Sequence, residues 1–140
     1  MGLIYSDIEA EIRNVLISDA TIQNLLGVDS IGVLERIYVG HITDKTDPEY
    51  PCITFRMPSG GMNKNQFTIN PTLYLDVWCK TQLDTAQNIY DRVRQLVNLK
   101  PIPNSDIAQI KEIKYNDDLY EKVTRTYHIA TQYEVQAINR

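Results

Sequence analysis

The residues whose side chains could take part in catalysis or metal binding are few and far apart. The two histidines are His41 and His128, and neither has another histidine or a cysteine at ligand spacing nearby. Asp117 and Asp118 are adjacent carboxylates, but a calcium loop needs oxygens at several fixed positions and a glycine at its bend. We therefore interpret both histidines as solvated and the aspartates as part of a turn between strands.

The glycine pair Gly60 and Gly61 also lacks the spacing of a nucleotide site. A phosphate-binding loop places backbone N–H groups at a helix start with GxGxxG or GxxxxGK[ST] spacing, and neither pattern is present. Turn-forming residues surround the pair, so a turn explains it. The sequence predicts no cofactor, no metal and no enzymatic activity.

The two cysteines, Cys52 and Cys79, are expected to be free thiols. Residues 52–57 and 67–80 both alternate as strands do, and they are predicted to be hairpin partners. This alternation places Cys79 on the apolar face and Cys52 on the polar face. Thiols on opposite faces of one sheet cannot approach to the Cβ separation of ~3.8 Å that a disulfide requires.

Composition favours one globular domain over residues 1–140. The chain has 140 residues, of which 43% are hydrophobic, enough for one core. Apolar runs are far shorter than the ~20 residues that cross a bilayer, and the N-terminus lacks the pattern of a signal peptide, so we expect a cytosolic product without membrane contact. The net charge is −4 and the cations are scattered, which disfavours tight DNA binding and indicates protein partners.

Helical signals begin the chain. Ser6 and Glu9 have capping-box spacing, and apolar residues then recur every three or four positions. Asp19 can cap a fresh start, and Gly27 can take the left-handed conformation that ends a helix. The first 27 residues therefore predict a helix with a broken or re-capped end.

The remaining pattern predicts strands at 36–39, 52–57, 67–80, 107–115 and 123–135, with a helix at 82–98 opened by a Thr81–Asp84 capping box. The segment 107–115 is ambiguous because Ile107, Ile110 and Ile113 step by three, and we interpret it as a strand. This order predicts an α+β fold: a mostly antiparallel sheet of four to five strands with two main helices packed on it.

Two surface features suggest partner contacts. Tyr74 and Trp78 lie on the non-core face of the predicted strand 67–80, where large apolar groups need a cover. Either a neighbouring subunit or the chain itself could supply it. The second feature is the long hairpin loop 58–66, which includes Gly60, Gly61, Met62, Asn63, Lys64 and Asn65.

The ordered set of segments resembles the tail terminator or tail completion proteins of long-tailed phages. The likeness lies in a first helix that closes on NLLG, followed by RIYVG, DPEYPCITF, LYLDVWCKT, AQNIYDRVRQLV and RTYHIATQYEV. It extends over most of the chain. No single segment is diagnostic, and the resemblance rests on their order.

The resemblance implies a structural virion protein located in the tail and assembled in the bacterial host cytoplasm. It implies a homo-oligomeric ring, commonly a hexamer, that ends polymerisation of the tail tube protein and offers a surface to head–tail connector proteins. DNA would only pass through the channel, without sequence-specific binding. Six copies at −4 each carry about −24, a charge that repels phosphates.

Two alternatives stay open at this point. Another head–tail joining protein, such as a head completion or neck ring subunit, has similar size and α+β character. A monomeric ligand-binding domain would instead enclose a pocket lined by Tyr74 and Trp78.

Overall fold

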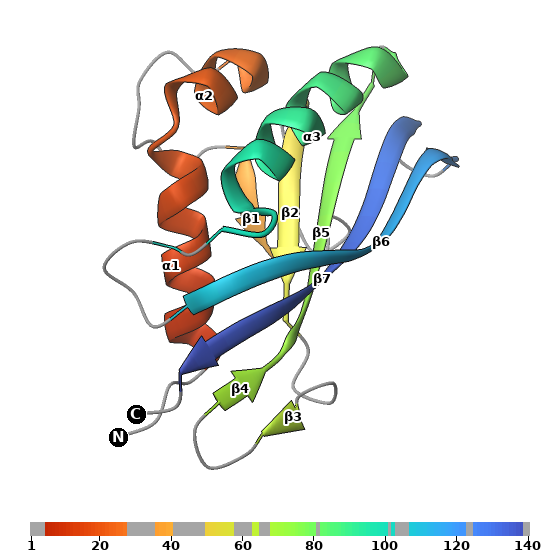
Figure 1. Cartoon of the computed structure of the whole chain (residues 1–140). Helices are drawn as coiled ribbons and strands as arrows, with labels where there is room; N and C mark the ends of the chain where they lie inside the picture. The colour runs from red at the N-terminus through yellow and green to blue at the C-terminus, as the bar shows by residue number, and fades with distance from the viewer. Residues whose placement is uncertain are drawn as a thin grey trace.

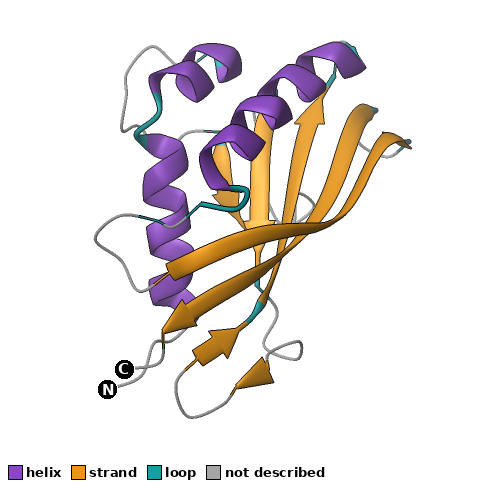
Figure 2. Cartoon of the chain, viewed as in Figure 1, coloured by secondary structure: helices purple, strands orange, loops and turns teal. Residues whose placement is uncertain are grey.

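The computed structural model describes residues 5–27, 36–40, 50–57, 63–64, 68–80, 82–100, 102, 107–122 and 125–138. It has an α+β fold in which helices cover one face of a single, mostly antiparallel sheet (Figures 1 and 2). The predicted fold class is confirmed. No helix in the described part of the chain is long and apolar enough to cross a membrane.

The N-terminal helix is re-capped as the sequence predicts. Helix α1 spans Tyr5–Ile17 and α2 spans Ala20–Leu26. Between them, the Asp19 carboxylate accepts a hydrogen bond of 2.9 Å from the backbone N–H of Ile22. Gly27 has a φ of 81°, in the left-handed region that favours glycine, and its N–H closes the end of α2.

In the described part of the chain, seven strands form the sheet. The strands are β1 Ile37–Val39, β2 Cys52–Arg56, β3 Asn63–Lys64, β4 Thr68–Asn70, β5 Thr72–Cys79, β6 Ile107–Glu121 and β7 Thr126–Ile138. The order is β1-β2-β5-β7-β4-β3, with β6 on the other side of β7. Among the strands of the described residues, β1 and β2 pair in parallel and the other pairs are antiparallel.

The predicted strand 67–80 is divided into β4 and β5 at Pro71, with Phe67 outside the described residues. Proline has no N–H to donate to a ladder. Its carbonyl still accepts a hydrogen bond of 3.0 Å from the Val135 N–H. Both halves pair with β7 in one continuous register, so a single ladder is interrupted without being shifted.

Strand β6 differs from the prediction. It continues to Glu121, so the interpretation of Asp117 and Asp118 as part of a turn between strands is wrong. Its pairing with β7 shifts register at three places, one of them between Asn116 and Leu119. A bulge inserts an extra residue, which explains why Ile107 and Ile110 are both buried although they are three residues apart.

Helix α3 spans Leu83–Val97 and packs on β5, β6 and β7. Thr81 of the expected capping box lies outside the described residues; Gln82 is the N-cap, and its side chain makes no cap hydrogen bond. Arg92 holds the helix against the N-terminal segment, because its guanidinium binds both carboxylate oxygens of Asp19 at 2.7 and 3.0 Å.

A polar cluster lies between α3 and the sheet. The hydroxyl of Tyr90 contacts both Tyr133 and Glu112, and Arg94 donates to Glu112 at 3.1 Å. Burial is the first cause that raises the pKa of both tyrosines above the ordinary value. The cluster satisfies polar groups that would otherwise be costly inside an apolar core.

We predict that Asp19→Ala lowers the free energy of unfolding by about 1 kcal/mol, the usual cost of losing an N-cap. The hydrogen bond from Arg92 is the main reason that the pKa of Asp19 lies below its ordinary value. Because its pKa is lower in the folded than in the unfolded protein, the ionised Asp19 side chain stabilises the fold at pH values above the unfolded-state pKa. This stabilisation is lost as the pH falls through the folded-state pKa. Urea unfolding at several pH values measures both effects.

The matched control is Asp19→Asn, which keeps a good capping side chain and removes the charge that Arg92 binds. It should cost less than Asp19→Ala at neutral pH. Equal stability of Asp19→Ala and the unchanged protein at neutral pH would contradict the assigned role.

Candidate functional site

The predicted contact residues are only partly within the described chain. Gly60, Gly61, Met62 and Asn65 lie outside the described residues, as does His41. Asn63 and Lys64 form β3, which pairs with β4. Tyr74 and Trp78 lie on the same face of β5, opposite the face that α3 covers. Their part in a partner interface stays a prediction.

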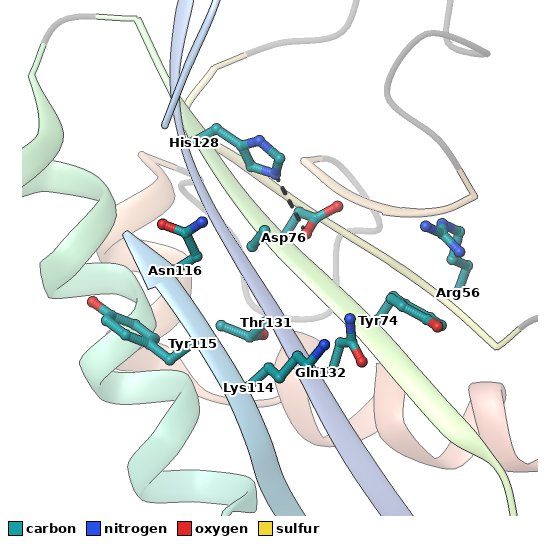
Figure 3. A pocket seen from close by; sticks show the side chains of 10 residues that line it. Arg56, Tyr74, Asp76, Lys114, Tyr115, Asn116, His128, Thr131 and Gln132 are labelled. Carbon is teal, nitrogen blue, oxygen red and sulfur yellow. Dashed lines mark ion pairs between the residues drawn. The ribbon is translucent and has the colours of Figure 1, made fainter. Parts of the chain in front are cut away.

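The antiparallel register aligns side chains in rows across this open face of the sheet. Successive residues of a strand point to opposite faces, so every second residue of β2, β5, β7 and β6 contributes to it. Three such rows lie beside one another. Members of all three rows line a hollow with a volume of about 730 Å³ (Figure 3).

The first row, which we name the cationic row, carries a positive charge at each end. Its members in order are Arg56, Tyr74, Gln132 and Lys114. The Arg56 guanidinium lies 4.5 Å from the centre of the Tyr74 ring, a cation–π contact. Among the residues that the structure describes, no carboxylate pairs with Arg56 or Lys114.

The middle row lies beside the cationic row, and all its members except Thr54 line the hollow. It consists of Thr54, Asp76, Ala130 and Asn116. The small side chain of Ala130 leaves space between the larger neighbours on either side. Asp76 points across this space toward His128, with 3.4 Å between Oδ1 and Nε2 (Figure 3).

The third row, the aromatic row, consists of Cys52, Trp78, His128 and Leu119. The rings of Trp78 and His128 stack with centroids 3.8 Å apart, and the indole N–H donates to the Thr54 hydroxyl at 2.9 Å. The expectation of a solvated His128 is wrong, because stacking leaves only 18% of its side chain exposed.

Trp78 is itself only 6% exposed. The sequence leaves open whether a neighbouring subunit or the chain itself covers Trp78. This low exposure favours a cover supplied by the chain itself. Tyr74 is half-buried and borders the hollow, so it is the more accessible of the two predicted aromatic contacts.

This arrangement contains no activated nucleophile. Cys52 is the buried end member of the aromatic row, and burial raises its thiol pKa to about 12, so the reactive thiolate does not form near neutral pH. Cys79 is buried on the other face, and neither cysteine is in a disulfide, as predicted. No group of three potential metal ligands occurs among the described residues. The site can bind through charge, hydrogen bonds and ring contacts.

Sequence reasoning missed Arg56, Asp76, Gln132 and Lys114 as members of one site. The sequence did contain one signal, because strand alternation places Arg56, Asp76 and Gln132 on the outer face of their strands. It could not bring together residues from four strands, because that requires the register of each pairing and the bulge next to Lys114.

A family comparison decides the class of protein. The model described as "Tail completion protein gp17" matches residues 10–136, nearly the whole chain. The chain belongs to the tail completion protein family. It is therefore a structural component of a virion tail, as the segment order predicted.

A structural comparison agrees with the fold. The tail completion protein is similar to a chain of a structure titled "Virion of native gene transfer agent (GTA) particle", with a TM-score of 0.69 and 11% sequence identity over 96% of each chain. At this identity the likeness concerns the fold. A comparison with curated proteins finds no match.

We predict that Trp78→Ala lowers the free energy of unfolding of the tail completion protein by about 3 kcal/mol, because it removes a buried ring and its hydrogen bond to Thr54. Urea unfolding at a concentration where the protein is monomeric measures this loss. The control, Tyr74→Ala, should cost no more than about 1 kcal/mol, since that ring is half-buried. An unchanged unfolding midpoint for Trp78→Ala, together with lost self-association, would instead place Trp78 in a subunit contact.

Proposed function

We propose that this tail completion protein forms a homo-oligomeric ring, a hexamer, at the head-proximal end of the tail. The ring ends polymerisation of the tail tube protein and provides the surface that head–tail connector proteins bind. The family match over residues 10–136 carries the proposal.

Two features of the chain support a binding role. The open sheet face holds charged and polar side chains around a hollow, with no activated nucleophile among them. Its charges at Arg56 and Lys114 are without carboxylate partners in the described chain, and such groups are available to a neighbouring protein. We accordingly propose that the protein is not an enzyme.

The net charge of the subunit supports a passive relation to DNA. Each copy carries −4, so a hexamer carries about −24, and this field repels phosphates on average. DNA that passes through such a ring is not held by it. Sequence-specific recognition would need base contacts from a cationic surface, which an acidic ring does not favour.

We predict that the purified protein shortens and caps tail tubes. Tube protein should be polymerised with increasing amounts of the tail completion protein, and tube lengths measured by negative-stain electron microscopy. The mean length should fall as the ratio rises, and one end of each tube should carry extra density. Adding the protein after polymerisation is complete should cap the tubes without shortening them.

Sedimentation velocity over a wide concentration range measures the size of the free or tube-bound oligomer. A protein that leaves both tube length and tube ends unchanged contradicts the proposed function. A ring that binds connector proteins but not tubes would identify a neck protein instead.

A further inference from the structure

Helix α3 carries an acidic stripe on its exposed side. The exposed positions recur every three or four residues and therefore form one line along the helix. The acidic stripe consists of Asp84, Asn88, Asp91 and Gln95. Its two carboxylates are seven residues apart, about 10 Å along the axis. Neither forms an ion pair with another described residue.

The cationic row has matching charge on the opposite side of the molecule. Arg56 and Lys114 are separated by three strand spacings, about 14 Å. Both side chains are long and flexible, so their charged ends can adjust to carboxylates about 10 Å apart. Gln132 lies between the two cations as Asn88 lies between the two carboxylates, and their side-chain amides can donate to one another.

The two charged surfaces cannot meet within one chain. Helix α3 covers the face of the sheet that holds Leu75 and Val77, whereas the cationic row lies on the other face (Figures 2 and 3). The sheet itself separates them. A second copy of the chain can bring its acidic stripe against this cationic row.

We propose that the acidic stripe of one copy binds across the cationic row of the next, and that this head-to-tail contact joins the subunits of the ring. The inference rests on the proposed ring function and assigns its contact surfaces. Two different patches meet at each contact, so the contact is heterologous and repeats around a ring when the rotation closes. Carboxylates pair with Arg56 in a bidentate manner and with Lys114 through single hydrogen bonds.

Charge reversal tests the contact. One variant carries Arg56→Glu and Lys114→Glu, and the other carries Asp84→Lys and Asp91→Lys. Each should self-associate at least about tenfold more weakly than the unchanged protein, because like charges then face each other. Circular dichroism should show an unchanged fold, since all four side chains are exposed or half-exposed.

Mixing the two variants in equal amounts should restore association. An acidic row on one variant then faces a basic stripe on the other, so the two surfaces attract each other with their charges exchanged. The control variant, Lys80→Glu with Lys122→Glu, changes net charge as much as the first variant does but lies outside the row, so it should associate normally.

Sedimentation velocity at low salt gives the readout, and capping of tail tubes gives a second one if the ring forms only on the tube. Variants that associate or cap as the unchanged protein does, or a mixture that does not recover, would overturn the contact and leave the ring function standing. An unchanged protein that neither forms rings nor caps tubes would defeat the proposed function itself.

Discussion

The fold depends on the pairing of β7 with three other strands. β7 pairs with β5 and β4 along one edge and with β6 along the other. Alternate side chains of this one strand serve two purposes: Tyr133 and Val135 are buried in the core, while His128 and Gln132 line the open face. A slip of one residue would exchange the two sets, so the register of β7 fixes the core and the binding surface together.

The features that the sequence predicted correctly are those with local causes. Asp19 begins and Gly27 ends a helical segment through contacts within three or four residues. The opposite placement of Cys52 and Cys79 follows from strand alternation and the hairpin pairing alone. Family membership could also be inferred, because the order of several short segments carries more information than any one of them.

The features that the sequence did not reveal depend on distant partners. The turn expected at 116–118 is part of a strand, because pairing with β7 and a bulge outweigh the turn preference of Asn116 and Asp117. His128 looks solvated in a strand pattern, but it is stacked on Trp78 from a neighbouring strand. The cationic row needs four strands in register before its charges stand in one line.

The shifts along β6 also affect how the subunit behaves before it finds its partners. A long, regular edge strand can act as a template on which identical chains stack into cross-β fibrils, which takes segments of about six residues. The longest stretch of β6 that pairs with β7 without a shift is Gln109–Glu112, four residues. Strand β6 is therefore poorly suited to seed fibrils of the subunit.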